Sequence, residues 1–310
     1  MKTNLVLLAT LFFFVASAQA QTADPALVEA LKRLKITGYV QAQYVQSEPA
    51  DDQFSVRRGR VKFTYQVNPT SRFVVQPDFS SSGVTLKDAY VELSEPWTSW
   101  RHTLTAGQFK WPFGFEVLYS SSEREMPERS RVIRTLFPGE RDRGVMFSGR
   151  GFDRKLRYDL AIVNGNGTET SSDDNERKDL VGRLGYDFGA FDIGASVYRG
   201  AQVLSSDIEA DKQREGVDVQ WATPLPGFSL RGEYVRGIER GLDVDGWYVY
   251  AIQKIGARQQ LTARLDEYED VETIGGSYVV HWDTNSKVML AYEDPSRGAD
   301  VWTLRYQFSF

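Results

Sequence analysis

The 310-residue sequence contains no cysteine and only two histidines, His102 and His281. Without cysteine the chain forms neither a disulfide nor a thiolate site, so its rigidity must come from hydrogen bonds and packing. The two histidines lie far apart in the sequence. They are too few for a histidine metal centre or for a histidine-based nucleophile triad. The composition therefore predicts no metal, no cofactor and no enzymatic centre of these kinds.

Long apolar runs are scarce as well. After residue 20 no run reaches the roughly 18–20 residues that a membrane-spanning helix needs. The run from Leu5 to Val15 follows the basic Lys2 and precedes the small residues at 16–20, and this order is typical of a secretory signal peptide. We predict residues 1–20 to be that peptide, with cleavage after Ala20. A membrane anchor is disfavoured because the run is too short.

The chain also lacks an excess of positive charge. Its formal net charge is -5 and its mean hydropathy is -0.40, and loss of Lys2 with the leader makes the mature chain more acidic. A basic surface for nucleic acid is therefore not expected.

What the mature sequence does contain is strict alternation of apolar and polar residues. The last eleven residues, DVWTLRYQFSF, place Trp302, Leu304, Tyr306, Phe308 and Phe310 at every second position. Such alternation predicts a strand with one apolar and one polar face. An aromatic terminal strand that ends on phenylalanine is a mark by which the outer-membrane assembly machinery recognises its clients. We expect that machinery to be a partner.

Alternating segments of about ten residues recur along the chain, separated by turn residues. The predicted strands are 36–46, 54–66, 71–80, 83–95, 101–110, 142–151, 155–164, 178–188, 191–201, 214–224, 227–238, 244–256, 258–268, 270–282, 286–294 and 300–310. Tight turns alternate with longer connections, including 165–177 and 202–213. An even strand count with this alternation is typical of an outer-membrane barrel whose termini both lie in the periplasm.

A soluble β-sandwich also alternates, but it is disfavoured here because aromatic residues gather near the segment ends, as interfacial girdles do. Strand edges cannot face lipid, so the strands must close. We predict an all-β, transmembrane antiparallel barrel of about sixteen strands over residues 36–310. It would sit in the outer membrane of a Gram-negative bacterium, in contact with its lipid.

The connection 111–141 is the longest in the predicted barrel, and loops of this length are usually functional. Its apolar residues Val117, Leu118, Val132, Ile133, Leu136 and Phe137 suggest that it packs against something. We expect this third outer loop to fold inward onto the barrel wall and narrow the pore. A loose external loop is the alternative.

If the apolar positions face lipid, the alternate positions line the lumen. In segment 54–66 this rule points residues 61, 63 and 65 outward and Arg58, Arg60 and Lys62 inward. A cation in mid-membrane lipid would cost about 2–4 kcal/mol, which favours the inward assignment. Three inward cations about 7 Å apart could pass an anion along the pore.

Acidic residues also fall on the predicted inner face, and they leave selectivity open. They are Asp88, Glu92, Asp159, Asp187, Asp192, Asp218, Glu233 and Asp266. The alternative to an anion track is therefore that opposite charges pair across the wall and keep the lumen wet.

Six segments carry a resemblance that sharpens this interpretation. They are ITGYVQAQY (36–44), FSVRRGRVKF (54–63), LKDAYVEL (86–93), GQFKWPFGFE (107–116), SSSEREMPERS (120–130) and LFPGERDRGVMFSG (136–149). Together, and in this order, they resemble the porin O/P family, the phosphate- and polyphosphate-selective porins of Gram-negative outer membranes. The similarity covers residues 36–151, and the later strands agree in style rather than in motif.

The resemblance implies a trimeric porin of sixteen strands whose third loop enters the channel. It also implies that an arginine ladder and a lysine bind small anions such as phosphate. Carried over by position, the candidates are Arg58, Arg60, Lys62, Lys110, Arg124, Arg129, Arg131 and Arg134.

Residues 21–35 are predicted to be a short periplasmic segment ahead of the barrel. Asp24 can cap a helix, Pro25 suits its first turn, and Leu27, Leu31 and Leu34 share one face. A helix this short is marginal in water on its own, so a coiled coil remains undecided here.

The sequence thus favours passive transport through a water-filled channel, with small anions as the solute. Two alternatives stay open: a general or weakly cation-selective porin, and a structural barrel whose lumen the long loop plugs.

Overall fold

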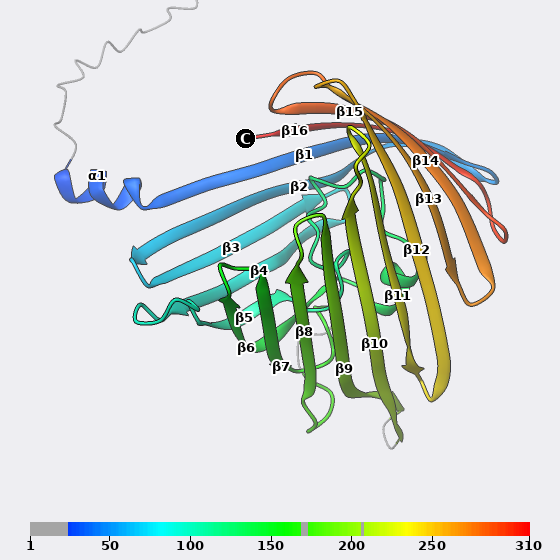
Figure 1. Cartoon of the computed structure of the whole chain (residues 1–310). Coiled ribbons are helices and arrows are strands. Elements are labelled where there is room, and N and C mark those ends of the chain that lie inside the picture. Colours follow the sequence, from blue (N-terminus) through cyan, green and yellow to red (C-terminus); the bar gives the residue numbers. More distant parts are fainter. Residues whose placement is uncertain (1–23, 169–172, 206–207) are drawn as a thin grey trace, which may run out of the picture.

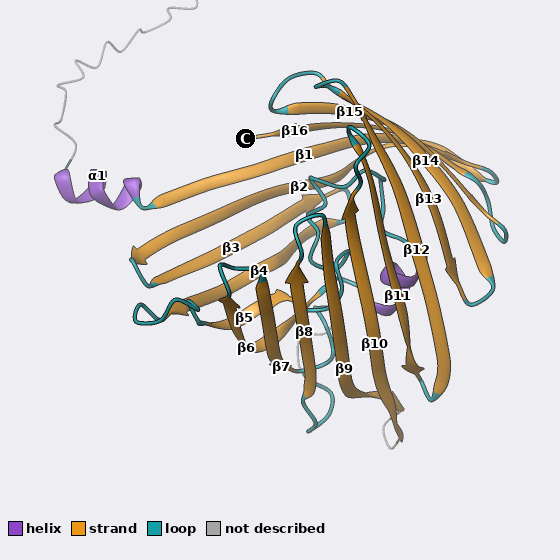
Figure 2. Ribbon diagram, in the orientation of Figure 1, coloured by secondary structure: helices purple, strands orange, loops and turns teal. Residues whose placement is uncertain are grey.

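The computed structural model describes residues 24–168, 173–205 and 208–310. The predicted leader, residues 1–20, lies outside them. The described residues form sixteen antiparallel strands that close into one barrel (Figure 1), with two short helices (Figure 2). The strands are β1 (Leu34–Ser47), β2 (Ala50–Asn68), β3 (Ser71–Ser80), β4 (Gly83–Ser94), β5 (Thr103–Lys110), β6 (Arg141–Gly151), β7 (Leu156–Val163), β8 (Asp179–Asp187), β9 (Phe191–Ser205), β10 (Ile208–Ala222), β11 (Phe228–Glu239), β12 (Leu242–Ile255), β13 (Gln259–Tyr268), β14 (Val271–His281), β15 (Ser286–Pro295) and β16 (Val301–Ser309).

The barrel closes where the first strand meets the last. β1 pairs antiparallel with β16, and Gly38 and Phe310 exchange two backbone hydrogen bonds of 2.9 Å. A Cβ on Gly38 would lie 2.4 Å from the Arg60 carbonyl oxygen and 2.5 Å from the Phe310 ring. The seam therefore requires a glycine there, and the final aromatic residue packs over it.

The predicted barrel and its strands are confirmed, with one exception. Residues 202–213 were expected to be a loop, but β9 continues to Ser205 and β10 begins at Ile208. Backbone pairing carries the hairpin on, with Gln202 opposite Ala210 and Ala201 opposite Asp211. Side-chain alternation fades there because both faces of the hairpin carry polar residues, whereas the hydrogen-bond ladder does not depend on side-chain polarity.

The last strand shows how the two faces divide. Trp302, Leu304, Tyr306 and Phe308 are each 43–49% exposed on the outer wall. Between them Thr303, Arg305 and Gln307 are only 4–5% exposed and point inward. The apolar face meets lipid, as the sequence predicted.

Helix α1 (Pro25–Lys32) precedes β1 and lies outside the barrel (Figure 1). Asp24 caps it, with its carboxylate accepting a 2.9 Å hydrogen bond from the Ala26 amide. Val28 and Leu31 remain exposed on its surface.

Neither helix in the described part of the chain is long and apolar enough to cross a membrane.

Leu304 tests the outer face, because it lies near the middle of β16 on the lipid side. Leu304→Arg should lower the free energy of unfolding in lipid vesicles by about 2–4 kcal/mol, since a charged side chain would replace an apolar one in the bilayer. The matched change Leu304→Phe keeps the surface apolar and should cost less than about 1 kcal/mol. Urea titration measures both, and equal losses would contradict the assignment.

Candidate functional site

The connection between β5 and β6, residues 111–140 and hereafter the inward loop, lies inside the barrel (Figure 1). It returns to β6 through α2 (Arg131–Leu136). The side chains of Phe113, Val117, Val132, Ile133 and Leu136 are fully buried. They form one cluster with residues of the wall, among them Tyr198, Val235, Tyr248 and Tyr250. The prediction that this loop folds inward is confirmed.

Glu128 of the inward loop anchors it to β2 and β16 of the wall. Its carboxylate accepts contacts from Arg57 at 2.9 Å, Arg58 at 2.8 Å and Arg305 at 3.1 Å. Burial opposes ionisation of this carboxyl group, but the field of Arg58 and the neighbouring guanidiniums outweighs burial and holds the Glu128 pKa well below its usual range. Glu128 therefore stays charged and ties the loop to β2 and β16.

Serines of the inward loop extend this attachment. Arg60 donates to the Ser121 hydroxyl at 2.9 Å and pairs with Asp78 of β3 at 2.7 Å. Gln41 of β1 donates to the Ser121 carbonyl at 3.0 Å, and Lys287 of β15 donates to the Ser122 carbonyl at 2.6 Å. The loop is thus fixed against a continuous arc of wall from β15 through β1 to β3.

Arg129 holds the loop's own shape. It donates to the carbonyl oxygens of Glu116 at 2.6 Å and Tyr119 at 2.9 Å, and it pairs with Glu140. Partial burial opposes ionisation of the Glu140 carboxyl, but Arg129 and the cations around it bring its pKa below the usual range. The guanidinium of Arg129 is therefore engaged within the loop and is not available to a solute.

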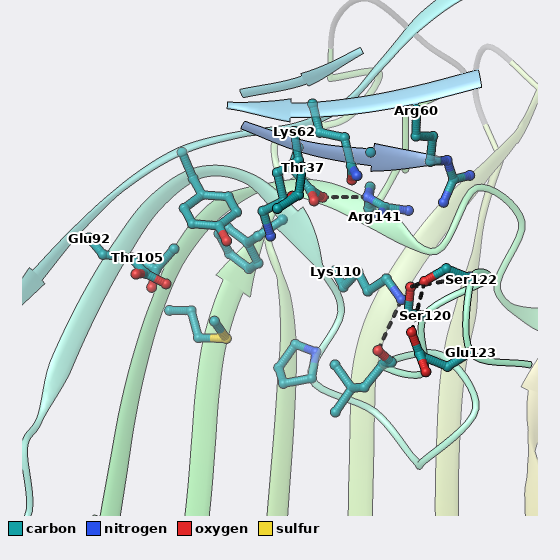
Figure 3. Close-up of a pocket in the computed structure, with 18 of the residues that line it drawn as sticks. Thr37, Arg60, Lys62, Glu92, Thr105, Lys110, Ser120, Ser122, Glu123 and Arg141 are labelled. Carbon is teal, nitrogen blue, oxygen red and sulfur yellow. Dashed lines mark hydrogen bonds and ion pairs between the residues drawn. The ribbon is translucent and has the colours of Figure 1, made fainter. Parts of the chain in front are cut away.

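A cavity of about 480 Å³ lies between the inward loop and the wall formed by β1 to β7. Figure 3 shows Lys62 and Arg60 on the strand side and Lys110 beside Ser120 and Ser122 of the loop. The charged side chains that line the cavity are Arg60, Lys62, Lys110, Arg141, Arg150, Asp88, Glu92, Glu123 and Asp159.

Most of these charges are paired within the wall. Arg141 contacts Asp88 at 2.6 Å, and Arg150 contacts Asp159 at 3.0 Å. Glu92, which lines the cavity from β4, pairs with Arg72 of β3. The alternative reading of the sequence, that opposite charges pair across strands, therefore describes much of the lumen.

Among the described residues the exceptions are two lysines and Glu123. Lys62 has no hydrogen-bond or ion-pair partner within the described ranges of the chain. The Lys110 ammonium donates to the carbonyl oxygens of Val117, Leu118 and Tyr119 at 2.9–3.0 Å. Carbonyl dipoles hold an ammonium in place without cancelling its charge, so both lysines leave positive charge at the cavity.

The structure divides the predicted ladder into two groups. Arg60, Lys62 and Lys110 line the cavity. Arg58, Arg124 and Arg129 are 3–4% exposed and sit in the attachment of the inward loop. On α2, Arg131 is half-buried and Arg134 is exposed, and neither lines this cavity.

Sequence reasoning missed Arg150 and placed Arg141 in the loop rather than on a strand. Arg150 shares its parity on β6 with the inward Met146, so alternation would have identified it. Arg141 gives no such signal, because both faces of the barrel wall are covered where β6 begins: Arg141 and Asp142 are both buried.

A family model described as phosphate-selective porin O and P matches residues 34–199. Comparison with curated protein sequences found no match. Among solved structures, the chain is similar to OmpF of Salmonella typhi in complex with daunomycin (TM-score 0.69, 12% identity, 89% of this chain and 97% of that one). It is equally similar to an anion-selective porin from Comamonas acidovorans (TM-score 0.69, 12% identity, 89% and 99%). The outer membrane channel DcaP of Acinetobacter baumannii gives a TM-score of 0.64 at 11% identity, over 89% and 97%.

Removing the charge of Glu128 should loosen the inward loop. Glu128→Gln leaves buried guanidiniums without their shared carboxylate, and we expect a loss of about 3 kcal/mol in stability with noisier, larger single-channel currents. The control is Glu123→Gln in the same loop, because Glu123 is exposed and has no ion-pair partner among the described residues. Thermal unfolding compares the two variants, and equal stability would refute the anchoring role. Bilayer recordings compare Glu128→Gln with the unmodified chain.

The lowered pKa values of Glu128 and Glu140 also predict the pH range over which the loop stays attached. Glu128 and Glu140 titrate lower in the folded chain than in the unfolded chain, where a glutamate has a pKa of about 4.3. Their stabilisation is therefore fully present above about pH 5 and is lost as the pH falls below about 4. Limited proteolysis of the loop should be unchanged from pH 7 to pH 5 and accelerate below pH 4. Loosening between pH 5 and pH 7 would show that other groups govern the attachment.

Proposed function

This chain belongs to the phosphate-selective porin O and P family and forms an outer-membrane channel, and we propose that the solute it favours is a small anion such as phosphate. The observation that carries the proposal is the pair of lysines, Lys62 and Lys110, that face the cavity without a carboxylate partner among the described residues. Transport through such a cavity is passive and needs no catalytic group.

The size of the cavity decides how much these charges count. At about 4 Å, a pair of unit charges is worth roughly 4 kcal/mol at an effective dielectric of 20, but only about 1 kcal/mol in bulk water. The inward loop packs on residues of β9, β11 and β12 and is tied to β1, β2, β15 and β16, so we place the path of the solute in the cavity between the loop and the wall of β1 to β7. In that confined space the field of the two lysines is screened less than in a wide pore.

The paired arginines play a different part. Arg60, Arg141 and Arg150 are each engaged by a carboxylate of the wall, so each pair contributes little net charge. Their remaining N–H groups can still hydrogen-bond a passing oxyanion. We infer that the lysines set the sign of the selectivity and that the arginines add hydrogen bonds.

A weakly cation-preferring general porin is the second candidate, and one observation favours it. Glu123 lines the same cavity from the loop side, exposed and without an ion-pair partner within the described part of the chain. If its charge dominates the narrowest point, the two lysines are offset. The ion preference of the channel separates the two candidates.

We also propose the setting of the barrel in the cell. Residues 1–20 serve as a signal peptide, α1 lies in the periplasm as part of segment 21–35, and the β16 strand ending at Phe310 engages the outer-membrane assembly machinery. A homotrimer is supported by the similarity to OmpT of Vibrio cholerae, whose structure is described as a trimer form (TM-score 0.63, 11% identity).

Lys62 offers the cleanest test of selectivity, because changing it breaks no side-chain hydrogen bond or ion pair within the described residues. Lys62→Glu should shift the zero-current potential in a potassium chloride gradient towards cations, since a fixed charge at the cavity changes sign. The control is Lys254→Glu, the same charge change at an exposed position that does not line the cavity. If both variants move the potential equally, or neither does, Lys62 does not face the conducting path.

A further inference from the structure

The cavity beside the inward loop also has an apolar lining, which its charged residues do not explain. The apolar residues are Tyr90 of β4, Phe109 of β5, Pro112 and Leu118 of the inward loop, and Met146 of β6. Leu118 is 39% exposed, whereas its neighbour Val117 is fully buried. A hydrated inorganic ion gains nothing from an exposed leucine, because apolar surface is stabilised only when another apolar group covers it. Apolar walls with a few charged groups are typical of sites for organic ligands.

On the wall, the apolar lining comes from neighbouring positions of the strand ladder. Tyr90 lies opposite Gly107 of β5, and Met146 lies opposite Thr105, which is labelled in Figure 3. Tyr90 and Met146 are half-buried and pack against the apolar cluster on which the inward loop sits. On β5, which separates them, Gly107 adds no side chain, and a Cβ there would lie 2.2 Å from the carbonyl oxygen of Ala89. The wall therefore presents the edge of the apolar cluster to the cavity.

On the loop side, Leu118 brings an apolar side chain next to a cation. Its backbone carbonyl accepts a 3.0 Å hydrogen bond from the Lys110 ammonium, and Leu118 lines the same cavity as Lys110. Phe109, directly before Lys110, and Pro112, two residues after it, add further apolar surface to the lining. This side of the cavity thus offers positive charge and apolar surface within a few residues of each other.

The charges of the lining favour a negative charge on the solute. Lys62 and Lys110 have no carboxylate partner among the described residues. The wall carboxylates Glu92 and Asp159 are each paired with an arginine, so they repel an anion less than free carboxylates would. After this pairing, the described lining keeps two cations and one carboxylate, Glu123, without an ion-pair partner.

We propose that the solute this cavity holds best is a small organic anion, in which an anionic head is joined to a flat, apolar body. The head lies at Lys62 and Lys110, and the body lies between Leu118 of the loop and Tyr90 and Met146 of the wall. A cavity of about 480 Å³ has room for such a solute. The proposal rests on the proposed function for the sign of the charge, and it narrows the class of solute. Inorganic phosphate offers the same head but no surface to bury against Leu118, so it is held less tightly.

Three probes with the same head test the class of solute: phenyl phosphate, glycerol phosphate and inorganic phosphate. At about pH 8 each is mainly the dianion, so the probes differ in their bodies rather than in charge. The concentration that halves the single-channel chloride current in a planar bilayer measures how tightly each is held. Because one face of its ring is buried, phenyl phosphate should block at about 5- to 10-fold lower concentration than glycerol phosphate, whose body is polar. Glycerol phosphate should resemble inorganic phosphate.

Leu118→Asn tests the apolar contact, because it makes an exposed side chain polar at similar size and keeps the carbonyl that holds Lys110. It should reduce the advantage of phenyl phosphate over glycerol phosphate to about 2-fold or less, and Leu118→Met, which stays apolar, should restore it. The matched control is Leu31→Asn, the same change at a 56% exposed position of α1 outside the barrel, and it should keep the full advantage. A general shift of the loop would alter the block by both esters together, so the ratio of the two isolates the contact with the apolar body.

Equal block by phenyl phosphate and glycerol phosphate in the unmodified channel would overturn the proposal, and so would an unchanged ratio in Leu118→Asn. If inorganic phosphate blocks as well as phenyl phosphate does, the proposed function stands and this inference alone fails. If none of the three probes blocks, the cavity does not hold anions, and the proposed function fails together with the inference. The two failures are therefore distinguishable.

Discussion

Within the hydrocarbon region of a membrane, a backbone N–H or C=O that lacks a partner costs several kcal/mol, and every other feature of this molecule follows from that constraint. It forces all sixteen strands into one closed ladder, with β1 against β16. Closure also fixes which side chains face lipid and which face inward. The inward face then carries arginines, lysines and carboxylates, because the lipid-facing positions must be apolar.

A lumen lined by charged residues must satisfy them, and this chain does so with carboxylates of the wall itself and, in part, with carboxylates of its inward loop. Glu128 meets three guanidiniums from β2 and β16, while Arg231 of β11 reaches Glu125 at 2.9 Å. Arginine suits this task because its planar group donates in several directions at once. Some of the residues that make the lumen polar therefore also hold the loop. Within the described residues Lys62 and Lys110 form no ion pair, and we propose that they supply the positive charge that a solute meets.

The fold was predictable from the sequence because period-two alternation directly reports a wall with lipid on one side. Alternation failed where the strands no longer have lipid on one side. The outer end of the hairpin of β9 and β10 is such a place, because it continues by backbone pairing alone. It also gave no signal at Arg141, where β6 begins and Arg141 and Asp142 are both buried. That Arg58 and Arg60 point inward was predictable from the sequence. Their roles were not, because the role of Arg58 depends on Glu128, which lies far along the chain in the inward loop, and the role of Arg60 depends on Asp78, which lies on another strand. Family resemblance located the loop arginines without revealing that Arg129 is occupied by carbonyls of its own loop.

The central claim is that the cavity beside the inward loop carries two lysines without a carboxylate partner among the described residues, and that their charge outweighs that of Glu123. The most direct measurement is the zero-current potential of the unmodified channel in a planar bilayer across a potassium chloride gradient. Our account predicts a potential whose sign indicates a preference for chloride. Addition of phosphate should then reduce the chloride current. A potential of the opposite sign would show that Glu123 governs the passage and would contradict the account.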